Sequence, residues 1–241
     1  MALRTQLLTK DSHVVAPTTI IYSTNPWVGM AVNGVEYFSK GPDLPIVFAE
    51  LAGCLLAQAV GLPVPDVAAV VDGDETFAGS ASVNGAFRTI EPWLKHRKRI
   101  VNFEDLFGSI VVDVWLANTD RNIGNVISRP EGSHVHLVFI DFEKSVTLRP
   151  QPRISSNMVS PRSLWPSGIL GSELLRVKPL VPPLYMLERI HQITNERCAE
   201  IIHEAAIAIG VPIEWEDDSI SAVCSRSDQI YQLSEEVWEA V

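Results

Sequence analysis

Along the first part of the chain, short runs of apolar and β-branched residues alternate with turn residues. Three runs follow His13, with the sequences VVAPTTIIY, WVGMAV and VEYFSK, and Asn33-Gly34 separates the last two. Asn-Gly between two such runs is a strong β-hairpin signal, because both residues tolerate positive φ. The pattern therefore predicts strands here and places Lys40 at the end of the last one.

Helical spacing replaces this pattern in the segment IVFAELAGCLLAQAVG, which follows Pro45. Its apolar positions recur at the spacing expected for one face of a helix. The predicted apolar stripe consists of Val47, Leu51, Leu55 and Ala59. Gly61 is the expected end of the helix, because glycine commonly follows the last helical turn. Glu50 lies near the start of this helix.

The next segments again predict strands. LPVPDVAAVVDGDETFAG has the pattern of a strand, an Asp-Gly turn and a second strand, and GAFRTIEPW predicts a further strand that ends at Pro92. We therefore expect a small mixed sheet with one helix in this part of the chain.

Beyond Trp93 the pattern becomes mainly helical. NFEDLFGSIVVDVWLAN has a broad apolar face, and Asn102 is the expected N-cap of this helix. Residues 143–183 are rich in Pro and Ser, which predicts a long irregular segment. Helical character returns in YMLERIHQI, in NERCAEIIHEAAIAIG and from Ser227 to Ala240.

These elements predict the α+β class and a two-lobed architecture. We expect a strand-rich small N-terminal lobe, residues 1–92, and a mainly helical C-terminal lobe, residues 93–241, with a connector near Glu91 to Arg97. A length of 241 residues and a hydrophobic content of 46% suffice for one core or for two lobes around a cleft.

The net charge disfavours two classes of binding partner. The formal net charge of −10 disfavours nucleic acid and anionic membrane surfaces as partners, because like charges repel.

The three cysteines share no metal-type spacing, which favours reduced thiols. We find no signal-peptide pattern at the amino terminus and no apolar run of about 20 residues that would span a membrane. The expected location is the cytoplasm.

The strongest chemical signal lies in the sequence from NTDRNIGN to IDF. Asp120 and Asn125 stand in a short polar loop, and Asp141 follows two apolar runs that predict a hairpin. Phosphoryl transfer can use an aspartate to accept a hydroxyl proton, and an asparagine with a second aspartate to hold Mg²⁺. The loop motif alone recurs by chance, but its position between an amphipathic helix and this hairpin favours a phosphotransferase site.

These residues give the chain a resemblance to the HipA-like kinases, within the wider group of protein and phosphatidylinositol kinases. The resemblance spans roughly residues 25–145. The matching residues are Lys40, Glu50, the phrase GLPVP at residues 61–65, NTDRNIGN at residues 118–125 and IDF at residues 140–142.

The resemblance implies ATP and Mg²⁺ as cofactors and a role for each matching residue. Lys40 would bind the nucleotide phosphates and be held by Glu50. Asp120 would deprotonate the acceptor hydroxyl, while Arg121 would neutralise the transferred phosphoryl group or brace the loop. Asn125 and Asp141 would bind Mg²⁺. The implied activity is that of a protein serine/threonine kinase, with an antitoxin-like or regulatory protein as a partner.

The chain also departs from the family pattern. Asn122 follows Arg121 where relatives usually have histidine, and Glu143 follows the IDF triplet where related kinases often have glycine. No G-x-G-x-x-G loop precedes Lys40, and the P-loop motif is absent, which excludes a P-loop NTPase. The turn STNPWVG is instead the expected cover for the nucleotide phosphates. Its candidate phosphate donors are Ser23, Thr24 and Asn25.

Two alternatives stay open at this stage. The departures fit a catalytically silent pseudokinase that binds a nucleotide or a partner. The same chemistry also fits a kinase for a small-molecule or lipid hydroxyl, although the acidic net charge disfavours the lipid. Two other sequence features favour simpler interpretations. His134 and His136 are expected to be exposed strand residues rather than metal ligands, and Lys95 to Arg99 to be a solvated linker.

Overall fold

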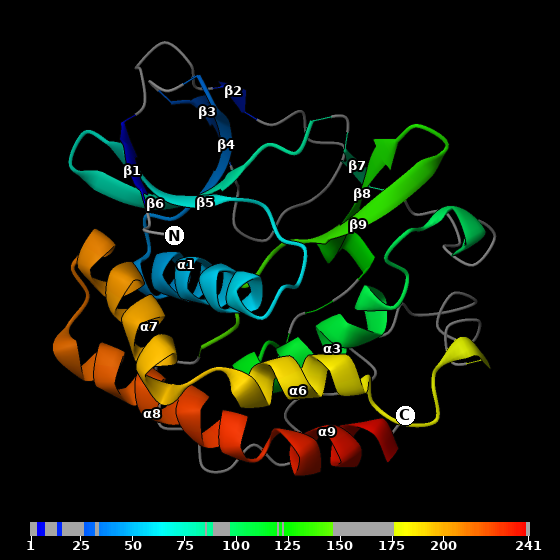
Figure 1. Ribbon diagram of the computed structural model, residues 1–241. Coiled ribbons are helices and arrows are strands. Elements are labelled where there is room, and N and C mark those ends of the chain that lie inside the picture. Colours follow the sequence, from blue (N-terminus) through cyan, green and yellow to red (C-terminus); the bar gives the residue numbers. More distant parts are fainter. Residues whose placement is uncertain are drawn as a thin grey trace.

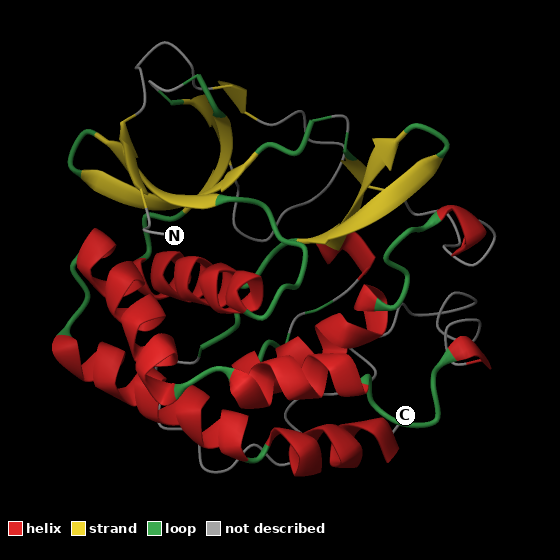
Figure 2. Cartoon of the chain, in the orientation of Figure 1, coloured by secondary structure: helices red, strands yellow, loops and turns green. Residues whose placement is uncertain are grey.

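The computed structural model describes residues 4–7, 14–15, 27–31, 34–84, 86–88, 97–119, 121, 123–146 and 176–239. Strands occupy one half of the molecule, and most helices occupy the other (Figures 1 and 2). The chain is thus a mixed structure of helices and strands, as the patterns predicted.

The described strands form two sheets. The strands are β1 (Arg4–Leu7), β2 (Val14–Val15), β3 (Trp27–Met30), β4 (Glu36–Lys40), β5 (Val67–Asp72), β6 (Glu75–Ala81), β7 (Phe87–Arg88), β8 (Val126–Glu131) and β9 (His134–Phe139). The larger sheet has the order β1-β5-β6-β4-β3-β2, and the smaller has the order β7-β8-β9. All described pairings are antiparallel except that of β1 with β5.

Two of the described α-helices lie between strands in the sequence, and the other four follow the last strand. The described α-helices are α1 (Leu44–Ala59), α3 (Asp105–Leu116), α6 (Leu184–Gln192), α7 (Asn195–Ile209), α8 (Ile213–Asp228) and α9 (Ile230–Glu239). Short 3-10 turns cover Arg97–Arg99 and Ile123–Asn125. None of these helices is long and apolar enough to cross a membrane.

The predicted hairpins are confirmed. β3 pairs with β4 from Trp27↔Ser39 to Met30↔Glu36, and Gly34 between them has a φ of 76°. β5 and β6 pair up to Asp72↔Glu75, and β8 and β9 form the hairpin that leads to the IDF triplet. The register of β4 places Lys40 at the end of its strand, opposite Ala78 of β6.

Helix α1 is buried on more than the predicted stripe. Every residue from Val47 to Ala57 is buried, while Ala59 at the end of the helix is exposed. The reason is that α1 packs against β5 and β6 on one side and against α7 on the other (Figure 1). A helix covered on both sides needs apolar residues all around it. Gly61 follows the helix with a φ of 79°, as predicted.

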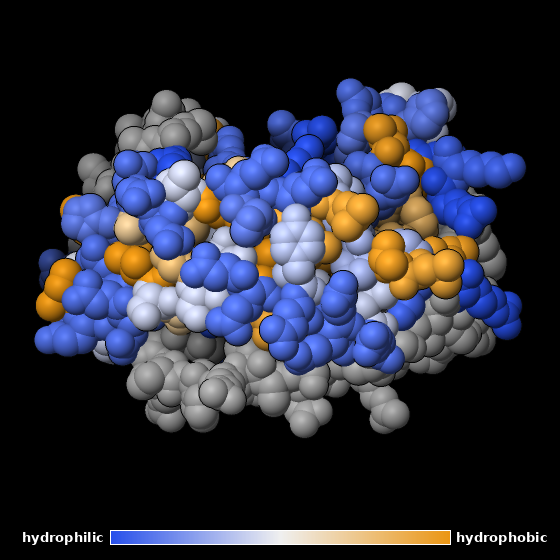
Figure 3. Space-filling model, turned by 60° about the horizontal axis from the view of Figure 1, so that its bottom comes forward, coloured by the Kyte–Doolittle hydropathy of each residue, from blue (hydrophilic) through white to orange (hydrophobic). Residues whose placement is uncertain are grey.

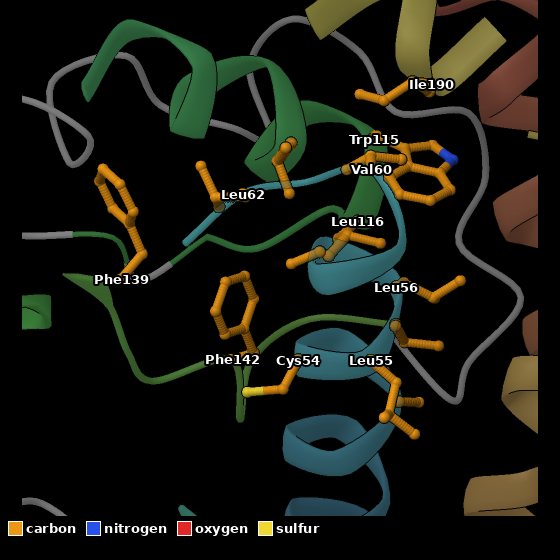
Figure 4. Close-up of a cluster of buried hydrophobic side chains, with 14 of the residues drawn as sticks. Cys54, Leu55, Leu56, Val60, Leu62, Trp115, Leu116, Phe139, Phe142 and Ile190 are labelled. Atoms are coloured by element: carbon orange, nitrogen blue, oxygen red, sulfur yellow. The ribbon is translucent and has the colours of Figure 1, made fainter. Parts of the chain in front are cut away.

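One continuous core joins α1 to the helices that follow. Figure 4 shows side chains of α1, α3 and α6 converging with Phe139 and Phe142. Trp115 is fully buried here, and its Nε1 donates to the carbonyl of Val223 in α8. This core fixes the end of α3 and the segment after β9 relative to α1, and both lead into the predicted site.

One predicted detail is wrong, and one helix was not predicted. Asn102 does not cap α3, because the N-cap is Glu104 and the Asn102 side chain instead exchanges hydrogen bonds with the backbone of Leu137 in β9. Helix α8 was not predicted. Its buried residues are Ser219, Val223, Arg226 and Ser227. This stripe is narrow and mostly polar, so α8 carries almost no apolar periodicity for a sequence pattern to reveal.

Other predictions lie partly outside the described residues. The predicted strand in GAFRTIEPW is seen only as β7, and the lobe boundary at residue 92 falls in a range that is not described. Of the predicted irregular segment, residues 147–175 are likewise not described. All three cysteines are free thiols, as expected.

The helical side of the molecule exposes apolar groups among many hydrophilic residues (Figure 3). The most exposed large apolar residues precede or begin α6 or lie on α7 and α8. They are Leu180, Val181, Leu184, Ile207 and Ile213, and Val101 before α3 is exposed to the same degree as Val181. Figure 3 shows apolar patches on this face separated by hydrophilic ones rather than one continuous apolar surface.

Candidate functional site

Lys40 is the centre of a cluster of charges drawn from distant parts of the chain. Its Nζ lies 2.5 Å from Oδ1 of Asp141, 3.3 Å from Oε2 of Glu50 and 3.5 Å from Oε2 of Glu143. Burial alone would lower the pKa of Lys40, but the three carboxylates raise it above its ordinary value. The lysine is therefore held as a cation at the end of β4.

Glu50 is fixed in place by more than its contact with Lys40. It is 1% exposed, and its Oε2 accepts a hydrogen bond of 2.7 Å from the backbone N–H of Phe142. Its Oε1 lies 3.5 Å from the hydroxyl of Ser80, which donates to it from β6. A buried carboxylate needs such partners. Glu50 thus ties α1, the sheet and the segment after β9 to one point.

Asp141 occupies a special backbone conformation beside Lys40. Its φ is 71°, in the left-handed region that aspartate and asparagine tolerate better than most residues. Its side chain is 26% exposed, against 2% for Glu50 and Glu143. Of the three carboxylates around Lys40, Asp141 is therefore the one best placed to reach a ligand.

Arg121 is buried and braces the loop. Its Nε and Nη2 donate to the two oxygens of Asp113 at 2.9 and 3.0 Å, and Nη1 donates to the backbone carbonyls of Asn125 and Ile140. The guanidinium also lies over the Phe142 ring, 4.5 Å from its centroid. Burial would lower the pKa of Arg121, but Asp113 raises it. Of the two roles considered for Arg121, this geometry supports bracing rather than contact with a phosphoryl group.

Asp113 is a site residue that the sequence patterns did not assign. It lies in the middle of α3 with no exposed surface, and it also accepts a 2.8 Å hydrogen bond from Nδ2 of Asn118. The available signal was a single acidic residue within the otherwise apolar run from Ile110 to Ala117. A charge at such a position requires a partner elsewhere in the fold.

Asn125 and the segment before Asp141 lie side by side. The backbone N–H of Ile140 donates to the carbonyl of Asn125 at 2.9 Å, and the Asn125 side chain is largely buried. The amide oxygen of Asn125 and the carboxylate of Asp141 are hard oxygen donors, and Mg²⁺ is commonly held by one or two carboxylates together with substrate phosphates. This donor set fits Mg²⁺. Among the described residues there is no group of three His, Cys, Asp or Glu side chains that could hold a metal by itself.

The close approach of α1 to the segment after Asp141 depends on Gly53. A Cβ at this position would lie 2.2 Å from Oγ of Ser145 and 2.8 Å from Cβ of Phe142. Ser145 cannot easily move, because it is buried and its one hydroxyl proton is shared between the carbonyls of Ala49 and Phe142.

We expect Gly53→Ala to destabilise the fold by about 1 kcal/mol or more, because overpacking outweighs the gain in helix propensity. Urea unfolding measures the change in free energy. Ala59→Val is the matched control, since it adds volume at the exposed end of the same helix. Equal stability of Gly53→Ala and the wild type would contradict the tight packing described above.

Several predicted site residues lie outside the described residues. These are Asp120 and the proposed phosphate donors Ser23, Thr24 and Asn25. The neighbours of Asp120 are described, since Thr119 and Arg121 flank it. Arg121 therefore anchors the loop that carries the predicted base.

Two weaker candidates have ordinary surface roles. His134 is exposed, and the Nε2 of His136 pairs with the carboxylate of Glu131 across the hairpin. In the linker, residues 97–99 are exposed, and Nε of Arg99 donates to the carbonyl of Ser133. Neither set resembles a metal site in the part of the chain that is described.

The arrangement of these sheets and helices is similar to the fold of a kinase of known structure. The crystal structure of the Helicobacter pylori proinflammatory kinase CtkA matches the chain with a TM-score of 0.60, covering 98% of this chain and 99% of that one. The sequence identity is 14%, so this likeness concerns the fold alone. No protein-family model and no curated protein sequence matches the chain.

Proposed function

We propose that the chain is an ATP- and Mg²⁺-dependent phosphotransferase, a protein serine/threonine kinase of the HipA-like type. The observation that carries this proposal is the meeting of Lys40 with Glu50 and Asp141, which lie on β4, on α1 and after β9. Lys40 and Asp141 are 101 positions apart in sequence. The kinase-like fold supports the proposal independently of these side chains.

Each residue has a physical task in this reaction. The ammonium of Lys40, oriented by Glu50, binds nucleotide phosphates. Asp120 accepts the proton of the acceptor hydroxyl, and Asp113 acts through Arg121 to hold the loop of Asp120 in place. Asn125 and Asp141 would hold Mg²⁺, which when bound offsets negative charge on the phosphates.

The acceptor and the partners are proposed from the sequence alone. A protein or small-molecule hydroxyl accepts the phosphoryl group in the cytoplasm, and an antitoxin-like or regulatory protein is the expected partner. A lipid acceptor and nucleic acid are disfavoured by the net charge of −10.

Incubation with γ-labelled ATP tests the proposal. We expect transfer of label to the protein itself or to a generic acceptor protein in the presence of Mg²⁺ and none in excess EDTA. Thermal unfolding with ATP and Mg²⁺ is the companion measurement, because a ligand that binds the folded state raises the melting temperature. Absence of any ATP-dependent shift, with or without the metal, would refute the proposal.

One observation favours the pseudokinase as a second candidate. The buried carboxylate of Glu143 adds to those of Glu50 and Asp141 around Lys40, so nucleotide phosphates must compete with three internal partners for the lysine. A metal-dependent thermal shift without any transfer of label would identify this alternative.

A further inference from the structure

The charges around Lys40 do not balance. Three carboxylates, those of Glu50, Asp141 and Glu143, lie within 3.5 Å of one ammonium, so the formal sum of this group is −2. The group is largely shielded from water, since the side chains of Glu50 and Glu143 are only 2% exposed and that of Lys40 is 15% exposed. Charges act over longer distances in such surroundings than they do in water.

Glu143 differs from Glu50 in how it is held. Neither of its carboxylate oxygens accepts a hydrogen bond from the described residues, although both are buried. Among the described residues it forms ion pairs instead, with Nζ of Lys40 at 3.5 Å and with Nζ of Lys144 at 3.7 Å. Lys144 is half exposed and therefore well hydrated. Because Glu143 has charge contacts but no hydrogen bonds among the described residues, its carboxylate acts on the site through its negative charge.

Any phosphate that binds Lys40 comes near this carboxylate. Nζ of Lys40 lies 3.5 Å from Oε2 of Glu143, and a nucleotide triphosphate brings several negative charges of its own. The single positive charge of Lys40 cannot offset both. A divalent cation can, and the partly exposed carboxylate of Asp141, which contacts the same lysine, is placed to hold one.

We propose that Glu143 is a specificity-determining residue that makes nucleotide binding depend on a divalent cation. It does so by repelling nucleotide that arrives without metal, rather than by binding the metal. The inference rests on the proposed nucleotide site and adds that this site binds the metal-bound nucleotide in preference to the metal-free one.

The test compares affinity for ATP by isothermal titration calorimetry in excess MgCl₂ and in excess EDTA. The proteins are the wild type, Glu143→Gln and the control Glu75→Gln, which removes an exposed acid at the far end of β6. We expect Glu143→Gln to bind ATP in EDTA at least about tenfold more tightly than the wild type does, since one close repulsive charge is removed. Its affinity in MgCl₂ should change little, and Glu75→Gln should match the wild type in both buffers.

Three results would overturn the inference. Unchanged affinity of Glu143→Gln in EDTA, with normal binding in MgCl₂, removes the inference and leaves the proposed function intact. Weaker binding of this variant in MgCl₂, without a gain in EDTA, shows instead that Glu143 is a metal ligand. No binding of ATP to the wild type in either buffer removes both the inference and the proposed function.

Folding of the variant is measured separately. Because Glu143 is buried without hydrogen bonds from the described residues, we expect Glu143→Gln to melt at the wild-type temperature or above it. If the glutamine variant does not fold, Glu143→Ala undergoes the same pair of titrations and must show the same gain in EDTA.

Discussion

The Asp141→Asn variant is expected to keep its fold and to lose phosphoryl transfer by about 100-fold or more, because the proposed metal site loses its partly exposed carboxylate. Asparagine is the right replacement. Asp141 has a φ of 71°, and asparagine tolerates this conformation whereas alanine would add backbone strain. The isosteric amide also keeps an oxygen close to Lys40, which retains its contacts with Glu50 and Glu143.

Transfer of label from ATP and the Mg²⁺ dependence of ATP affinity are the two measurements for this variant. The control is Asp74→Asn, which removes an exposed carboxylate at the turn between β5 and β6. Asp120→Asn provides the contrast: as the proposed base, it should lose transfer by about 10²–10⁴-fold while keeping metal-dependent binding. Full transfer by Asp141→Asn would remove Asp141 from the proposed metal site.

The Asp113→Ala variant is expected to lose about 3–5 kcal/mol of stability, because it leaves the guanidinium of Arg121 buried without its counter-charge. Both residues are almost completely buried, and two hydrogen bonds join them. The loss would also release the turn that ends at Asn125 and the segment after β9, because the carbonyls of Asn125 and Ile140 accept hydrogen bonds from the same guanidinium. Urea unfolding measures the free energy, and ATP turnover measures the consequence for the site.

The double variant Asp113→Leu with Arg121→Met separates stability from positioning. Replacing both members of a buried ion pair by apolar groups of similar size is often nearly neutral for stability. We therefore expect the double variant to recover much of the stability lost in Asp113→Ala while transfer stays low, because the loop carbonyls still lack their donor. Loss of less than about 1 kcal/mol in Asp113→Ala would show that the pair is not an essential brace.

Local patterns succeeded where the determining interactions are local. The turns at Gly34 and Gly73 adopt positive φ between strands that pair as predicted, and Gly61 ends α1. Turn chemistry and helix termination depend on a few neighbouring residues, so the sequence reveals them directly.

Patterns failed where burial came from a distant element. The apolar stripe of α1 understated its burial, because α7 covers a face that no local pattern assigns to it. The sequence pattern did not predict α8, because this helix buries mainly polar residues. One of them is Arg226, whose Nε donates to the carbonyl of Trp115. The position of Asn102 predicted a helix N-cap, yet its side chain forms hydrogen bonds with the backbone of Leu137 in β9.

From the sequence, local patterns predict the order of most strands and helices and the chemical groups of the site, namely a lysine, carboxylates and an amide. Which of these groups meet depends on the tertiary structure. It placed Glu143 beside Lys40 and paired Arg121 with Asp113. The physical reason is that contacts between residues far apart in sequence depend on strand register and on the packing of α1 and α3, which no local periodicity encodes.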